Sequence, residues 1–169
     1  MPCCPARGKG MPTPRFSTKK KDNMDTTDEH FMRLALKEAQ LALQEEEIPI
    51  GAVIVANGRI VARAHNQTET LHDVTAHAEM LAITAAENLL GGKYLTGCTL
   101  YVTVEPCVMC AGAIGWSQLA RVVYGCADEK RGFARLAPNA LHAKATVTRG
   151  VLEAECRQMM QDFFRQKRK

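Results

Sequence analysis

The chain has 169 residues, 46% hydrophobic and 24% charged, which is typical of one globular domain. No apolar run approaches the roughly 18 residues of a membrane span, so the composition excludes a membrane-spanning protein. The seven cysteines are odd in number, and the first residues lack the apolar region of a signal peptide. We therefore expect a cytoplasmic, reducing location and no disulfide framework.

The net charge of +4 is unevenly distributed along the chain. Residues 1–23 hold six lysines and arginines against a single acid, Asp22, a net charge of +5, and the rest of the chain sums to −1. The remainder is nearly neutral, so global charge gives no argument for nucleic-acid binding. Residues 1–24 are rich in Pro, Gly, Thr and Lys without periodicity, and we expect them to form a disordered basic extension. Residues 25–169 are then the single folded domain.

The first expected elements are a helix and a hairpin. Apolar residues recur at helical spacing over residues 26–47, and Thr27 or Asp28 can cap the start of this helix. An Asn57-Gly58 pair then separates two β-rich runs. This dipeptide is the strongest short-range signal for a β-hairpin.

The second half of the chain alternates between helical and strand patterns. The expected elements are a helix over 76–90, a strand over 98–105, a helix over 106–118, strands over 120–126 and 144–150, and a closing amphipathic helix over 151–169. This order predicts a three-layer α/β/α sandwich around a mixed, mostly five-stranded sheet. The opening hairpin would be antiparallel, and helical crossovers would join the later strands.

Two short motifs indicate metal chemistry. Cys107 and Cys110 lie three positions apart at the start of a predicted helix, which places both sulfurs on one face and favours the thiolate. His77 opens the preceding helix, and one imidazole with two thiolates suits Zn²⁺ with an open fourth position. Glu79 need not join His77 on the metal and can instead exchange protons with a zinc-activated water. We therefore predict one catalytic Zn²⁺ per chain.

Other interpretations of the paired cysteines stay open. Such pairs also occur in redox proteins and in structural zinc modules that bind RNA or protein. Structural zinc normally takes four protein ligands, whereas no fourth cysteine or histidine lies close in sequence. Cys98, Cys126 and Cys156 lie in apolar contexts typical of small buried side chains.

The sequence resembles the bacterial tRNA-specific adenosine deaminases, within the cytidine deaminase-like superfamily, from about residue 28 to residue 169. The segments that carry the resemblance are IPIGAVIV, HNQ, HDVTAHAE, LYVTVEPCVMCAGA, RVVYG and the closing DFF with its basic residues. The histidine, glutamate and paired cysteines match the general signature of zinc deaminases. The resemblance implies a cytidine deaminase-like homodimer without a nucleotide cofactor. It also implies hydrolytic deamination of adenosine to inosine at the wobble position of tRNA anticodons.

The resemblance also implies roles for individual residues. His77, Cys107 and Cys110 match the family's zinc ligands, and Glu79 matches its proton-shuttling glutamate. Asn66 matches the asparagine that hydrogen-bonds the substrate nucleoside.

Three residues near the C-terminus match positions expected close to the tRNA anticodon stem-loop. Phe163 matches an aromatic position near the bound RNA, and Arg165 and Lys167 are expected to contact phosphates. The basic end favours RNA over the alternative substrates, which are free guanine or a cytosine nucleotide. Arg131 and Phe133 depart from the smaller residues usual in their loop, so their effect on base recognition stays open.

Overall fold

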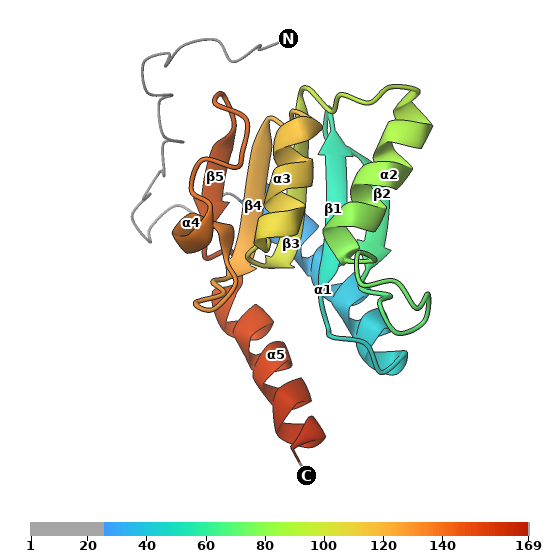
Figure 1. Ribbon diagram of the computed structural model, residues 1–169, viewed down its shortest axis with the longest axis vertical. Helices are drawn as coiled ribbons and strands as arrows, with labels where there is room; N and C mark the ends of the chain where they lie inside the picture. The colour runs from blue at the N-terminus through green and yellow to red at the C-terminus, as the bar shows by residue number, and fades with distance from the viewer. Residues whose placement is uncertain (1–25, 169) are drawn as a thin grey trace, which may run out of the picture.

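The computed structural model describes residues 26–168 (Figure 1). The expected disordered extension over residues 1–24 lies outside this range. The elements are α1 (Thr26–Gln44), β1 (Gly51–Ala56), β2 (Arg59–His65), α2 (Ala78–Leu90), β3 (Cys98–Val104), α3 (Val108–Trp116), β4 (Arg121–Cys126), α4 (Phe133–Leu136), β5 (Thr146–Arg149) and α5 (Glu153–Lys167). No helix in the described range is long and apolar enough to cross a membrane.

The strands form one mixed sheet in the order β2-β1-β3-β4-β5. Strand β1 is antiparallel to both β2 and β3, while β3, β4 and β5 run parallel. Asn57 and Gly58 connect β1 to β2 with φ values of 50° and 72°. Positive φ at both positions matches the twist of the flanking strands, and the predicted hairpin is confirmed.

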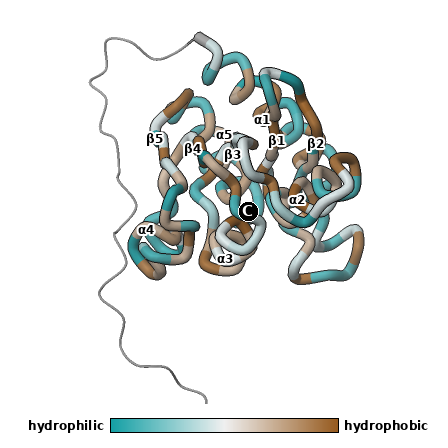
Figure 2. The backbone as a smooth tube through the Cα atoms, turned by 90° about the horizontal axis from the view of Figure 1, so that it is seen from above, coloured by the Kyte–Doolittle hydropathy of each residue, from teal (hydrophilic) through white to brown (hydrophobic). Residues whose placement is uncertain are grey.

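Helices cover both faces of the sheet (Figures 1 and 2). Helices α2 and α3 pack on one face, where the core includes Ala82, Ile114 and Leu100. Helices α1 and α5 pack on the other, around Met32 and Tyr101. Successive side chains of each strand point to opposite faces of the sheet, so the same strands contribute apolar side chains to both cores. The predicted three-layer sandwich with a five-stranded mixed sheet is confirmed.

The start of α1 differs from the expectation. The helix begins at Thr26, so Thr27 and Asp28 lie inside its first turn rather than at its cap. The Asp28 carboxylate is buried and accepts hydrogen bonds from Arg121 Nη1 at 2.9 Å and Nη2 at 2.6 Å. The Tyr101 hydroxyl donates to it at 2.9 Å. Asp28 therefore links α1 to β3 and β4. Its bidentate pair with Arg121 stabilises the fold more than a cap at the helix surface would.

Candidate active site

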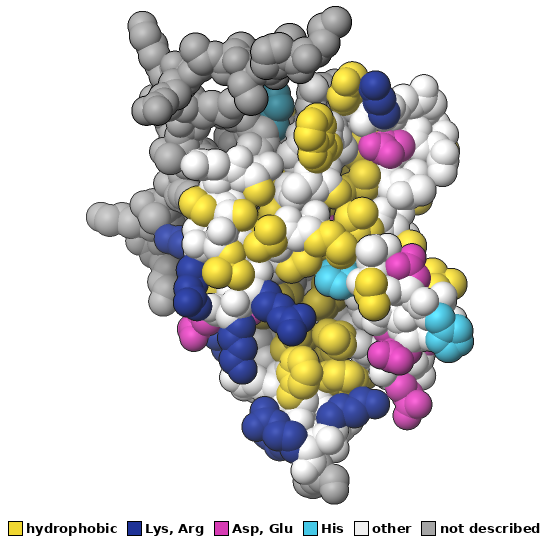
Figure 3. Space-filling view, viewed as in Figure 1, with side chains coloured by type: hydrophobic (Ala, Val, Ile, Leu, Met, Phe, Trp, Pro, Cys, Tyr) yellow, Lys and Arg dark blue, Asp and Glu magenta, His cyan; other side chains and the backbone are white. Residues whose placement is uncertain are grey.

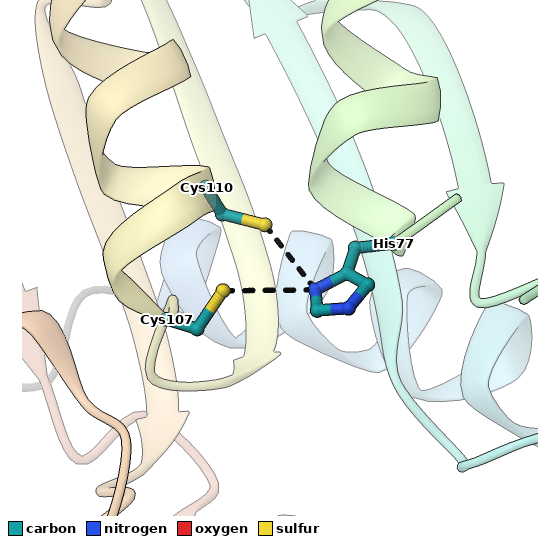
Figure 4. Close-up of side chains that lie close together, drawn as sticks. All are labelled: His77, Cys107 and Cys110. Atoms are coloured by element: carbon teal, nitrogen blue, oxygen red, sulfur yellow. Dashed lines mark hydrogen bonds between the residues drawn. The ribbon is translucent and has the colours of Figure 1, made fainter. Parts of the chain in front are cut away.

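Three side chains converge where α2 and α3 begin (Figure 4). His77 and Cys107 are the N-cap residues of the two helices, and neither side chain caps its own helix. Instead, His77 Nδ1 lies 3.5 Å from Cys110 Sγ and 3.7 Å from Cys107 Sγ. The three ligand atoms all lie within 4.8 Å of one another.

This donor set fits a single zinc ion. Nitrogen and sulfur ligands about 2.0 and 2.3 Å from a tetrahedral zinc lie roughly 3.5 to 3.8 Å from each other, which matches the separations of His77 from the two sulfurs. Within residues 26–168, every cysteine is a free thiol. The group formed by His77, Cys107 and Cys110 could therefore hold one metal ion and leave a fourth coordination position open.

The pKa values of the two thiols are shifted in opposite directions. Hydrogen bonding from Cys110 lowers the pKa of Cys107 to about 4, against the opposing effect of burial and with help from His77. The same hydrogen bond and burial raise the pKa of the Cys110 thiol. Cys107 is therefore the more easily ionised of the two thiols. A bound dication favours loss of the second proton, since metal binds the thiolate form.

Glu79 lies beside this group on the first turn of α2. Its side chain is 3% exposed, and among the described residues Glu79 Oε2 is a buried oxygen without a hydrogen-bond partner. Burial raises the pKa of Glu79 to about 7, with smaller opposing effects from a backbone hydrogen bond and His77. A buried carboxylate oxygen without a hydrogen-bond partner is costly for stability, and groups with such shifted pKa values cluster at functional sites.

The backbone beside Asn66 is hydrogen-bonded to the backbone beside His77. Asn66 follows β2, and the N–H of Gln67 donates to the carbonyl of Ala76, the residue before His77, at 3.0 Å. The Asn66 side-chain amide is buried and donates to Glu47 Oε2 at 2.9 Å. Sequence reasoning missed Glu47, because a run of three glutamates after a helix is typical of a solvated helix end.

The Glu105 carboxylate and the backbone of Cys107 both contact the loop after β4. The carboxylate accepts the backbone N–H of Asp128 and of Ala134, each at 3.0 Å. Gly132 pairs with Cys107 in an isolated β-bridge. A Cβ at Gly132 would lie 2.4 Å from the Glu105 carboxyl carbon, so only glycine allows this close approach.

The two unusual residues of this loop have different environments. Phe133 is fully buried and packs edge-on against the ring of Tyr124, with centroids 6.4 Å apart. Phe133 is therefore a core residue and does not face a substrate. Arg131 is exposed. The hydrogen bond with Cys107 is the main influence that raises the pKa of His77, and Arg131 is near enough to oppose that rise.

The C-terminal residues singled out in the sequence lie together on the last turns of α5. Phe163 is only 7% exposed, whereas Phe164 is 40% exposed. Lys167 Nζ lies 5.6 Å from the centroid of the Phe163 ring, and Arg165 pairs with Asp162 at 3.5 Å. These residues form no hydrogen bond or ion pair with His77, Cys107, Cys110 or Glu79 in the described part of the chain. Figure 3 shows Lys and Arg side chains in the lower half of the face that carries α2 and α3.

Apolar side chains gather over α2 and α3 on the same face (Figure 3). A groove of about 430 Å³ lies between these helices, lined in part by Met80, Ile83, Tyr94 and Trp116. The Trp116 side chain is 85% exposed. A large exposed apolar group beside a groove indicates an interaction surface.

Comparison with known proteins agrees with the fold and the site. A family model described as the cytidine and deoxycytidylate deaminase zinc-binding region matches residues 25–126. The sandwich fold and the His-Cys-Cys group thus define a zinc-binding deaminase. A tRNA-specific adenosine deaminase of Bacillus subtilis is 50% identical over 149 residues, which cover 85% of this chain and 92% of that protein. The chain belongs to the tRNA-specific adenosine deaminase family.

Further relatives support this assignment. A tRNA-specific adenosine deaminase of Agrobacterium fabrum is 44% identical over 144 residues, covering 82% of this chain and 95% of that protein. A solved structure from a study of A-to-I editing by tRNA:A34 deaminases at the wobble position of transfer RNA has a TM-score of 0.73 and 45% identity, over 77% of this chain and 98% of that chain. A guanine deaminase structure from Bacillus subtilis has a TM-score of 0.56 and 42% identity, over 59% of this chain and 64% of that chain.

Proposed function

We propose that this protein hydrolyses adenosine to inosine and ammonia at the wobble position of tRNA anticodons. The observation that carries the proposal is the buried Glu79 carboxylate, whose Oε2 has no hydrogen-bond partner, beside His77, Cys107 and Cys110. The relatives described above, which carry the name tRNA-specific adenosine deaminase, support adenosine in tRNA as the substrate. A tRNA substrate also favours a cytoplasmic location.

The roles follow from the chemistry of the side chains. His77, Cys107 and Cys110 hold one Zn²⁺, which when bound acts as a Lewis acid that activates water for attack on C6 of adenine. Glu79 takes one proton of the attacking water and delivers it to N1 of the ring. It then moves the remaining hydroxyl proton to the amine at C6, which leaves as ammonia while C6 becomes the carbonyl of inosine. In the metal-free protein, burial raises the pKa of Glu79 to about 7, so its carboxyl group holds a proton more readily than an exposed glutamate does.

The substrate base must leave its stack to reach a buried carboxylate, which costs a few kcal/mol and is easiest in a loop. Asn66 contacts the nucleoside, and Arg165 and Lys167 contact phosphates of the anticodon stem-loop. Because Phe163 is buried, we assign its ring the role of holding Lys167 by a cation–π contact rather than stacking on a base.

We also propose that the protein is a homodimer formed through α2 and α3. The exposed Trp116 and the apolar groove beside it support this surface. Burying a tryptophan at a subunit interface is strongly favourable, since large aromatic side chains dominate interface energetics.

The assay offers the reduced, zinc-loaded protein an anticodon stem-loop with adenosine at the wobble position, and in parallel free guanine and cytidine nucleotides. Inosine and ammonia from the stem-loop alone are expected. Deamination of guanine is the second candidate, because a guanine deaminase shares 42% identity over part of the chain. Turnover of guanine or of a cytidine nucleotide, without turnover of the stem-loop, would overturn the RNA assignment. Zinc binding without any turnover would indicate a structural metal site.

A further inference from the structure

Glu47 is a fully buried acid outside the group already assigned to chemistry. It lies between α1 and β1, with no exposed surface. Its Oε1 accepts the backbone N–H groups of Glu69 and Thr70, each at 2.8 Å. Its Oε2 accepts the Asn66 side-chain amide at 2.9 Å and the Thr68 hydroxyl at 3.2 Å. The Glu47 carboxylate therefore accepts four hydrogen bonds, two at each oxygen.

These contacts fix the charge of Glu47. Burial by itself would raise the pKa of Glu47, but the hydrogen bonds from Thr70, Thr68 and Glu69 outweigh it and lower the pKa. The group is therefore a carboxylate at neutral pH, and a carboxylate can only accept hydrogen bonds.

The orientation of the Asn66 amide follows from this charge. The NH₂ group must face the Glu47 carboxylate, and its second donor reaches Thr68 Oγ1 at 3.2 Å. Both donors of Asn66 are then used by the protein. The amide oxygen forms no hydrogen bond with any residue in the described range, and it is the atom left for a ligand.

We propose that Glu47 is a positioning residue that presents the Asn66 amide oxygen to a ribose 2′-hydroxyl of the substrate. This inference rests on the proposed function and deepens it, because it names the part of the nucleotide that is recognised. The ring nitrogens of adenine only accept hydrogen bonds, and its amine is the group that reaction replaces. Within an RNA strand, the 2′-hydroxyl is the remaining donor, and it is the group that distinguishes RNA from DNA.

Glu47→Gln tests this arrangement with little change in shape. The glutamine oxygen can keep the two backbone donors of Glu69 and Thr70, but its NH₂ then faces Asn66 and forces that amide to turn over. The measured quantity is the ratio of kcat/KM for two stem-loops that carry adenosine or 2′-deoxyadenosine at the target position. One hydrogen bond to a buried acceptor makes this ratio about 5 to 150 in the wild type. We expect a ratio below about 3 in the variant. Glu46→Gln removes the same charge from the exposed neighbouring residue and should keep the wild-type ratio.

The double variant Glu47→Gln with Asn66→Asp provides the rescue. One oxygen of the carboxylate introduced at position 66 accepts from the glutamine and the other again accepts from the 2′-hydroxyl, so the ribose preference should return. A purely structural role for Glu47 would lower both rates together and leave the ratio unchanged, which would overturn the inference. If the zinc-loaded wild type turned over neither of the two stem-loops, that result would instead refute the proposed function. A wild-type ratio near one would refute the ribose contact alone.

Discussion

Replacing Glu79 by glutamine separates chemistry from metal binding. The amide has nearly the same shape but cannot carry a proton, so kcat on the stem-loop should fall by about 10²- to 10⁴-fold. Zinc content should stay at one per chain, because His77, Cys107 and Cys110 are unchanged. Glu155→Gln makes the same substitution at an exposed residue in the first turn of α5 and is the control, which should keep the wild-type kcat.

The same substitution should stabilise the metal-free protein at high pH. The pKa of Glu79 rises from 4.5 to about 7 on folding. At 1.36 kcal/mol per pKa unit, ionisation then costs the folded state about 3 kcal/mol. Since the folded value is the higher one, this contribution favours folding at low pH and is lost as pH rises through about 7. Glutamine removes the cost.

Urea unfolding of the chelated proteins checks this reasoning at two pH values. We expect Glu79→Gln to exceed the wild type by up to about 3 kcal/mol at pH 8.5, and by less than about 1 kcal/mol at pH 5. Near-normal turnover would refute the assigned proton transfer. An equal stability difference at both pH values would show that burial of charge is not its cause.

Three further outcomes are expected. Cys110→Ser should bind far less than one zinc per chain by metal analysis and lose activity, since a hydroxyl is a poor substitute for a thiolate; zinc retention would contradict the ligand assignment. Trp116→Glu should shift the protein from dimer to monomer in sedimentation, whereas Leu136→Glu, exposed on α4, should not; an unchanged dimer would exclude this interface. Lys167→Ala should weaken stem-loop binding about 3- to 10-fold at low salt and reduce the salt slope by about 0.7, the value of one single-strand phosphate contact. An unchanged slope would show that Lys167 makes no phosphate contact.

The features that sequence predicts well here are local ones. The turn at Asn57-Gly58 depends on the φ preference of two residues, and the end of α2 depends on Gly91, which has φ 68°. The meeting of His77 with the two cysteines was also predictable, because each residue opens a helix on the same face of the sheet. Helix α4 was not predicted, since four residues are too few to show a period.

The features that sequence missed depend on distant contacts. Glu47 is buried because its partners lie 19 to 23 residues further along the chain. The sequence predicts Thr27 or Asp28 as the cap of α1, but the carboxylate of Asp28 instead pairs with Arg121, which lies 93 residues further along the chain. Phe163 is likewise buried by tertiary packing. The basic residues around it in the sequence give no indication of this burial.

The close approach of Gly132 to Glu105 has a consequence for how this protein can diverge. A side chain at residue 132 would push the loop away from Cys107, so that position cannot vary without disturbing the metal-binding group. Arg131, one residue earlier, is exposed and its side chain is not held by the core. Substitutions at residue 131 can therefore change the exposed surface near the metal-binding group, while Gly132 keeps the loop beside Cys107.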